Sequence, residues 1–150
     1  MAYAQRMQDA PALSAIRRMH GLAGPDAINL SLAVPDFVQH PAVTAAFFEV
    51  SREARFTRYA PNAGLLELRQ ELAAQFGVDV QNVVVTSGGQ QALFAALFAL
   101  ADANRSVGTF EPFYPAYASV SRLLGATVRT AALGVVFDLP HEFPDADVTV

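Results

Sequence analysis

The segment Val83–Phe94, with the sequence VVVTSGGQQALF, joins a short apolar run to a glycine pair and the start of an apolar helix. Val83–Thr86 are suited to a buried strand, and a helix pattern begins at Gln90. The N–H groups in the first turn of a helix lack partners within the helix, and the helix dipole adds partial positive charge there. Gly88 and Gly89 carry no Cβ atom, so an anion can approach their backbone closely. The segment therefore predicts an anion site, and we expect its ligand to be the phosphate of a small cofactor; a strand-to-helix turn without a ligand is the alternative.

The basic residues limit the chemistry of this site, because all ten are arginine and the chain contains no lysine. A nucleoside-triphosphate loop of the Walker type requires a lysine, so that class of site is excluded. The dinucleotide pattern is also missing, since no third glycine follows Gly88 and Gly89 before Gly108. Catalysis through a lysine Schiff base is impossible with these residues alone, and the absence of cysteine excludes a thiolate nucleophile.

The remaining polar residues do not predict a metal site. His20, His40 and His141 are dispersed and show no ligand spacing. Asp145 and Asp147 are close in sequence, but an acidic turn before a strand explains them better than a cation site.

The composition is that of a globular protein, with 53% hydrophobic and 16% charged residues. A net charge of −4 and a pI near 5.2 argue against nucleic acid or an anionic membrane as the main partner. The first residues contain no apolar stretch of signal-peptide length. The apolar run Ala92–Ala101 is too short to span a bilayer. We therefore expect a cytoplasmic protein that does not bind membranes or nucleic acid.

The elements that would position the glycine turn alternate between helices and strands. The predicted helices are Pro11–His20, one beginning at Pro41 with Val43, Phe47, Val50 and Ala54 on its apolar face, Leu65–Phe76, Gln90–Ala101 and Pro115–Leu124. The predicted extended segments are Ala27–Leu32, Val83–Thr86, Ser106–Phe110, Thr127–Ala132 and a strand opening at Val148–Val150, with a loop at Gly134–Pro144. Such alternation predicts an α/β fold with a parallel sheet and right-handed crossovers. By their spacing, Phe47, Phe48, Phe94 and Phe98 are expected in the core.

Four short blocks occur in a fixed order along the chain. They are Asn29–Phe37, Arg58–Gly64 with Leu68-Arg69 following, Thr86–Phe94 and Glu111–Tyr117. As an ordered set they resemble the pyridoxal-phosphate aminotransferases of class I/II, the fold-type I group, from about Ala27 to Val150. The resemblance implies a three-layer α/β/α fold that forms part of the mainly parallel sheet of the large domain. It assigns residues 1–40 to an N-terminal arm or small-domain segment and residues 41–150 to the first, incomplete part of the domain that binds pyridoxal 5'-phosphate.

The resemblance also implies roles for residues around the glycine pair. Gly88, Gly89 and Gln90 match the turn that holds the cofactor phosphate, with Ser87 beside them. Tyr114 matches the aromatic residue that stacks on the pyridine ring. A half-buried tyrosine at the start of a helix is the alternative explanation for Tyr114.

Two further positions match family motifs elsewhere in the chain. Tyr59 matches a tyrosine that reaches the cofactor phosphate of the neighbouring subunit, which implies a homodimer, although it also suits a packed loop. Ala33 stands where the family commonly has a glycine whose amide faces the substrate carboxylate, and this departure affects the substrate pocket. Arg58 and Arg69 are candidate anion binders, but the polar neighbours of Arg69 favour a solvated surface for it.

The resemblance also shows what the chain lacks. The family's Schiff-base lysine, the aspartate that binds the pyridine nitrogen and the arginine that binds the substrate carboxylate all fall beyond Val150. We therefore expect no catalytic residue in this chain, no activity from it alone, and a chain that is the front part of a longer protein. In the family's strand order, Val83–Thr86 has no neighbour within these residues, so we expect the chain to aggregate or to require further polypeptide to fold.

The implied reaction is amino-group transfer from an amino acid to a 2-oxo acid. Another fold-type I pyridoxal-phosphate enzyme, such as a C–S lyase, fits the same blocks. A non-catalytic truncated module that binds a partner, the effector domain of a regulator, and an unrelated α/β phosphate-binding domain also stay open. The sequence does not identify the amino donor or acceptor, nor whether a second polypeptide completes the site.

Overall fold

The computed structural model of the chain describes residues 14–28, 30–133 and 143–150. These residues fall into two compact units. One unit combines Met1–Ser31 with Gly88–Val150, and the other is Leu32–Ser87. The boundary between Ser87 and Gly88 falls inside the glycine turn that the sequence singles out.

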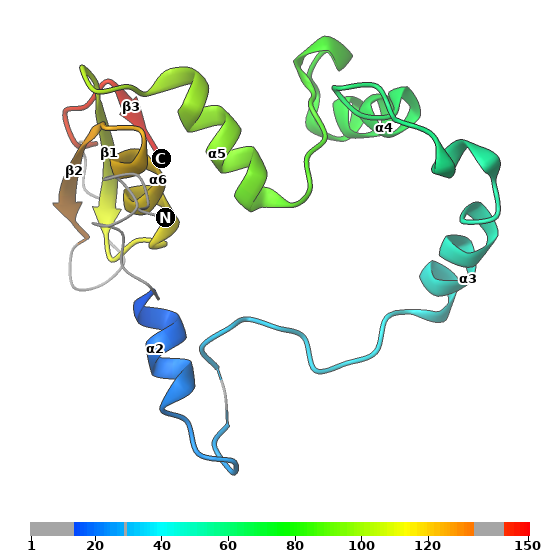
Figure 1. Cartoon of the computed structure of the whole chain (residues 1–150), viewed down its shortest axis with the longest axis horizontal. Helices are drawn as coiled ribbons and strands as arrows, with labels where there is room; N and C mark the ends of the chain where they lie inside the picture. The colour runs from blue at the N-terminus through cyan, green and yellow to red at the C-terminus, as the bar shows by residue number, and fades with distance from the viewer. Residues whose placement is uncertain (1–13, 29, 134–142) are drawn as a thin grey trace, which may run out of the picture. The chain divides into compact units, whose positions relative to one another are not determined.

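The first unit contains a parallel sheet of three strands (Figure 1). Its strands are β1 (Ser106–Glu111), β2 (Thr127–Ala132) and β3 (Val148–Thr149), in the spatial order β2-β1-β3. Residues Ser106 to Glu111 of β1 lie opposite Thr127 to Ala132 of β2 without a bulge. On its other side, β1 pairs with β3 through Val107 opposite Val148 and Gly108 opposite Thr149. The parallel α/β arrangement expected from the sequence is therefore confirmed.

The helices of this unit are α2 (Ala15–Gly21), α5 (Gly89–Leu100) and α6 (Ala116–Leu123). The unit's core joins α5, α6 and β1 through five buried residues: Leu97, Ala101, Val107, Val120 and Ala126. Helix α6 has a strongly one-sided apolar face, which explains why it can cover the sheet while its other side stays in water. This packing fixes both ends of the connection from β1 to α6.

The second unit contains α3 (Pro41–Val50), the short 3₁₀ helix η1 (Ala54–Thr57), α4 (Leu66–Phe76) and the 3₁₀ helix η2 (Val80–Asn82). Helix α4 ends at Gly77, whose φ of 65° is the left-handed conformation that glycine adopts without strain. Helix α3 begins with His40, whose Nδ1 accepts a hydrogen bond from the N–H of Ala42, followed by Pro41. Of the described side chains in this unit, only Ala73 is buried.

Several sequence predictions need correction. Among the described residues, Val83–Thr86 forms no strand of a sheet. This segment belongs to the second unit, whereas the sheet belongs to the first. The N–H of Val85 donates instead to the carbonyl of Ala63. The described part of Ala27–Leu32 forms no strand either. Helix α3 ends at Val50, so Ala54 does not continue its apolar face but begins η1.

The other expected helices and strands are present with small shifts at their ends. Helix α2 begins at Ala15 because the hydroxyl of Ser14 caps it, accepting a hydrogen bond from the N–H of Arg17. The expected start at Pro11 and most of the loop at Gly134–Pro144 lie outside the described residues.

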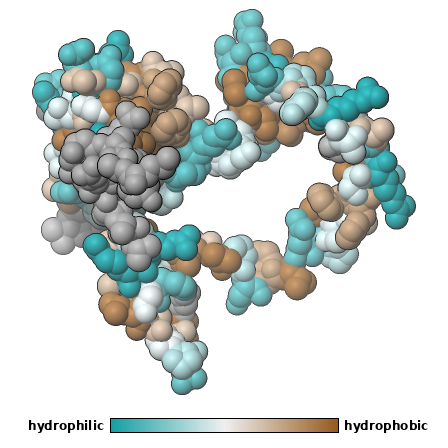
Figure 2. Space-filling model, in the orientation of Figure 1, coloured by the Kyte–Doolittle hydropathy of each residue, from teal (hydrophilic) through white to brown (hydrophobic). Residues whose placement is uncertain are grey.

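The phenylalanines expected in the core are exposed instead. Phe47 and Phe48 on α3 are more than half exposed, and so is Phe98 on α5. Helix α5 is apolar around its whole circumference, yet Leu97 is its one buried residue. Figure 2 shows apolar side chains on the surface over α5. The spacing correctly identified apolar faces, but the described residues do not cover them.

Candidate phosphate site

Helix α5 begins at the glycine pair in a conformation that requires glycine. Gly88 occupies the N-cap position with φ 80° and ψ 167°, a region that side chains with a Cβ atom essentially never adopt. As a glycine, Gly88 has no side chain with which to cap this end of the helix. Most helices begin with a side-chain oxygen that binds the first-turn N–H groups. The start of α5 therefore has the geometry of an anion site.

The space around the glycine pair is open. A Cβ atom placed on Gly88 or Gly89 would meet no described atom within 4 Å. The packing of the unit therefore does not explain why both residues are glycine. Gly88 must be glycine because of its backbone conformation. Gly89 lies inside the helix, where neither its conformation nor the neighbouring atoms exclude a side chain. An approaching ligand is a physical reason for the second glycine.

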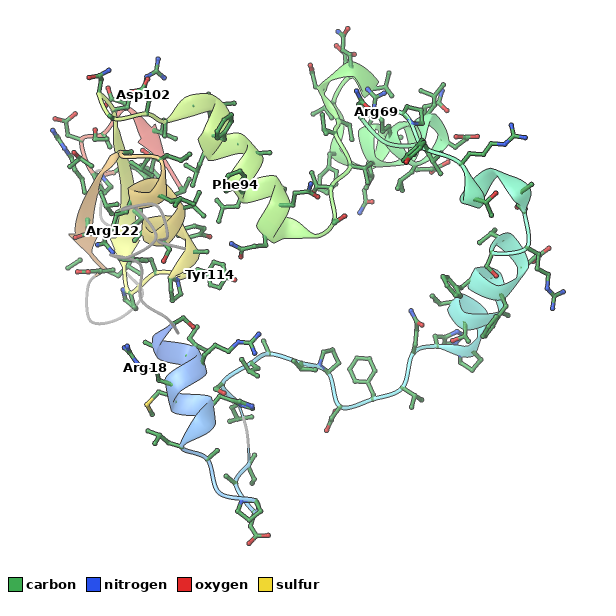
Figure 3. All side chains as sticks on the ribbon, in the orientation of Figure 1. Arg18, Arg69, Phe94, Asp102, Tyr114 and Arg122 are labelled. Atoms are coloured by element: carbon green, nitrogen blue, oxygen red, sulfur yellow. The ribbon has the colours of Figure 1, made fainter. Side chains whose placement is uncertain are left out.

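Tyr114 lies at this end of α5. The residue, labelled in Figure 3, belongs to the connection between β1 and α6. Its hydroxyl donates a hydrogen bond of 3.0 Å to Oε1 of Gln90 in the first turn of α5. Tyr114 is 52% exposed as a residue, and its ring makes an edge contact with that of Tyr117, with 5.8 Å between ring centroids. Because half of it is open to water, the Tyr114 ring has a surface on which a flat ligand can lie. The structure thus brings together Gly88, Gly89, Gln90 and Tyr114.

A shallow cavity of about 240 Å³ adjoins Gln90 and Tyr114. It is lined by Ser14, Gln90, Tyr114, Pro115, Ala116, Ser119 and Val120. The cavity is bounded by the first turn of α6 and by the residue that caps α2. Its mixture of hydroxyls, an amide and an aromatic ring suits a small polar ring compound. A helix start with two glycines and a half-exposed aromatic ring fit a phosphorylated aromatic cofactor.

The other residues that the sequence singled out belong to the second unit. Ser87, an exposed residue, directly precedes Gly88 in the chain. Tyr59 is fully exposed, so it is not the packed loop residue of the alternative explanation. Ala33 has φ 38°, the left-handed conformation that favours glycine. Alanine thus occupies a backbone conformation here that glycine adopts more readily.

Arg69 makes two hydrogen bonds that the sequence did not predict. Its Nε donates to the carbonyl oxygen of Val83 at 2.7 Å and its Nη2 to that of Val80 at 2.6 Å. The side chain is partly buried, so the expected solvated surface position is wrong. A signal was present, because Arg69 lies four residues after Leu65 and three before Leu72, on the apolar side of α4.

The described residues show no three His, Asp or Glu side chains grouped to hold a metal ion. Asp147 lies just before β3. The backbone N–H and then the hydroxyl of Ser106 bind this carboxylate and lower the pKa of Asp147 below its ordinary value. These contacts connect the beginnings of β1 and β3, so Asp147 has a structural role in the sheet.

Comparisons with known proteins identify one family. Residues 25–137 match the model of aminotransferase class I and II. A probable aspartate aminotransferase of Methanocaldococcus jannaschii is 30% identical over 142 residues, which cover 91% of this chain and 38% of that protein. A probable N-acetyl-LL-diaminopimelate aminotransferase of Bacillus subtilis is 34% identical over 123 residues, 76% of this chain and 31% of that protein.

Solved structures that resemble this chain are also aminotransferases. An aspartate aminotransferase from Thermus thermophilus superposes with a TM-score of 0.78 at 28% identity, over 89% of this chain and 38% of that one. The N-succinyldiaminopimelate aminotransferase from Mycobacterium tuberculosis gives a TM-score of 0.76 at 30% identity, over 89% of this chain and 36% of that one. The chain thus spans less than two fifths of the length of these relatives. Among the helices described here, none has the length and apolar character needed to cross a membrane. The family match covers most of the sequence, and it includes the glycine turn and Tyr114: the chain belongs to the aminotransferase class I and II family.

Proposed function

We propose that this chain forms the phosphate-binding part of the cofactor site of a pyridoxal-phosphate-dependent aminotransferase. The observation that carries the proposal is the start of α5, where Gly88 adopts a glycine-only conformation and Tyr114 binds the first-turn residue Gln90. Membership of the aminotransferase family supports pyridoxal 5'-phosphate as the ligand.

Each residue of the site has a distinct task in this proposal. The backbone N–H groups of Gly89 and Gln90 bind the phosphate at the positive end of the α5 dipole, and Ser87 supplies a hydroxyl beside them. The Tyr114 ring would stack on the cofactor ring, and its hydrogen bond to Gln90 would hold the tyrosine beside the start of α5. When bound, the cofactor supplies an electron sink for carbanions formed at the substrate Cα atom.

The proposed reaction is the transfer of an amino group from an amino acid to a 2-oxo acid. The chain contains no lysine, so it binds and orients the cofactor but has no catalytic residue, and alone it is inactive. The proposed protein is a cytoplasmic homodimer in which Tyr59 reaches the partner's phosphate and the backbone at Ala33 faces the substrate carboxylate. Residues 1–40 form the arm or small-domain segment, and residues 41–150 form the first part of the large domain.

Equilibrium dialysis of the chain against pyridoxal 5'-phosphate and against pyridoxal tests this proposal, and it tolerates self-association of the protein. The phosphorylated compound should bind at least about tenfold more tightly, equivalent to about 1.4 kcal/mol. Gly89→Ala should reduce this preference without lowering the melting temperature, because a Cβ atom there meets no protein atom within 4 Å. Equal binding of the two compounds by the unsubstituted chain would contradict the phosphate assignment.

A further inference from the structure

Arg69 holds two carbonyl groups with one guanidinium group. The residue lies on α4 and is labelled in Figure 3. Its Nε donates to the carbonyl of Val83 at 2.7 Å, and its Nη2 donates to the carbonyl of Val80 at 2.6 Å. Val80 is the first residue of η2, and Val83 directly follows its last residue. The carbonyl of Val80 also accepts a hydrogen bond from the N–H of Val83 at 3.3 Å. The guanidinium group thus closes the turn that leads into the extended segment Val83–Ser87.

A second contact holds the same segment two residues later. The N–H of Val85 donates to the carbonyl of Ala63 at 2.9 Å. Gly64, with φ 100°, lies so close to Val85 that an added Cβ atom would be 2.6 Å from the Cβ atom of Val85. The extended segment is therefore held at Val83 by Arg69 and at Val85 by the carbonyl of Ala63, and neither hydrogen bond belongs to a sheet.

The first contact requires arginine. A planar guanidinium group presents several N–H donors at fixed angles, so one side chain can serve two separate carbonyls. A lysine would keep the positive charge but would offer a single ammonium group, which cannot reproduce the two directions of the fork. Hydrogen bonds from a charged donor to partly buried carbonyls are also stronger than those between neutral groups.

We propose that Arg69 is a positioning residue for the phosphate-binding turn. By fixing Val80 and Val83, it sets the backbone path of the segment that ends at Ser87, the first residue of the proposed phosphate site. This role rests on the proposed function, since a positioned turn has a purpose only if it binds a ligand. Arg69 itself makes no contact with the cofactor in this proposal.

Hydrogen–deuterium exchange of the Arg69→Lys variant tests the role directly. Peptides covering residues 80–87 should exchange about tenfold faster than in the unsubstituted chain, because the fork to the two carbonyls is lost. Peptides covering β1, α6 and β2 serve as an internal reference and should not change. Arg52→Lys is the matched control, because Arg52 is an exposed arginine of the same unit.

Ligand selectivity supplies the second readout. The ratio of the dissociation constants of pyridoxal and pyridoxal 5'-phosphate should fall about tenfold in Arg69→Lys and stay unchanged in Arg52→Lys, with the affinity for pyridoxal itself preserved. Exchange that rises equally in the reference peptides would overturn the proposal, because Arg69 would then stabilise the whole fold. Unchanged exchange at residues 80–87, or unchanged selectivity despite faster exchange there, would overturn it too. If the unsubstituted chain shows no preference for the phosphorylated compound, the proposed function fails, and the exchange data still decide whether Arg69 fixes the segment.

Discussion

The hydroxyl of Tyr114 lies 3.0 Å from Oε1 of Gln90 and donates a hydrogen bond to it, although the two residues are 24 positions apart in the chain. This bond joins the β1–α6 connection to the first turn of α5. It places an aromatic ring beside a helix start whose N-cap residue, Gly88, has no side chain. Ring and helix start together are what distinguish this turn from an ordinary strand-to-helix connection.

Substitutions at Tyr114 should separate the ring from the hydroxyl. Tyr114→Ala removes the stacking face and should weaken the binding of both pyridoxal and pyridoxal 5'-phosphate by about tenfold, since an aromatic pair contributes about 0.5–1.5 kcal/mol beyond area burial. Tyr114→Phe keeps the ring and loses one exposed hydrogen bond, so its effect should be smaller. Equilibrium dialysis of the two variants gives the comparison; equal losses would show that the hydroxyl, not the ring, carries the interaction.

The two glycines of the turn should respond differently to alanine. Gly88→Ala forces a Cβ atom into a conformation that only glycine tolerates, and it should lower the free energy of unfolding by about 1–3 kcal/mol. Gly89→Ala places alanine in a helix, where it is favoured over glycine by up to about 1 kcal/mol. Urea unfolding of both variants measures the difference. A similar loss at both positions would mean that packing, not backbone conformation, selects glycine.

At Ala33 the opposite substitution, alanine to glycine, should be favourable. Its φ of 38° is strained for a residue with a Cβ atom, so Ala33→Gly should stabilise the chain by up to about 1 kcal/mol once the larger entropy of unfolded glycine is included. Ala46→Gly, at an exposed position within α3, is the control and should destabilise by about 0.5–1 kcal/mol. Thermal unfolding of both variants checks the signs. Destabilisation by both substitutions would argue that residue 33 is not strained.

The contact between Asp147 and Ser106 should make the attachment of β3 depend on pH. Because Ser106 lowers the folded-state pKa of Asp147, its stabilisation is complete above the ordinary carboxyl pKa. The stabilisation is lost as pH falls through the lowered value. Hydrogen exchange of residues 143–150, followed from neutral pH into this acidic range, should show the release after correction for the intrinsic pH dependence.

Asp147→Asn is the matched variant for this titration. It should weaken the attachment of β3 at neutral pH and remove the additional acid-dependent change. A variant that retained the full acid transition would assign it to other carboxyl groups.

The exposed apolar surface of α5 predicts self-association. Phe94 and Phe98 stack with 5.9 Å between ring centroids, and they are 39% and 67% exposed. Burying such a surface is favourable, so the chain in isolation should form oligomers or aggregates. Replacing both phenylalanines with asparagine should reduce light scattering, whereas Arg122→Lys, an exposed position on α6, should not. A monomeric chain with one cooperative melting transition would refute this prediction.

The sequence predicted the local structure of this chain better than its tertiary packing. The glycine stops and apolar periodicity placed α4, α5 and α6 within one or two residues, because these signals act within a helix. The exposure of Phe47 and Phe98 was not predictable, since spacing identifies an apolar face but not what covers it. The place of Arg69 on the apolar side of α4 signalled burial, but its hydrogen bonds were not predictable, because the carbonyls of Val80 and Val83 carry no sequence signature.

In the candidate site, too, the sequence predicted the local motifs but not the contacts between them. The order of blocks around Gly88 and Tyr114 led to the family, which the comparisons confirm. The hydrogen bond between Tyr114 and Gln90 depends on how α6 packs on the sheet, which sequence spacing does not encode. The left-handed backbone at Ala33 was likewise hidden, because alanine gives no warning of a positive φ.

The position of β1 between β2 and β3 has a consequence for biosynthesis. Both neighbours come later in the chain, so β1 leaves the ribosome with neither of its hydrogen-bonding edges occupied. The three described strands can pair with one another only after Thr149 has emerged. Until then the nascent polypeptide exposes two open edges of its central strand to chaperones and to neighbouring nascent chains.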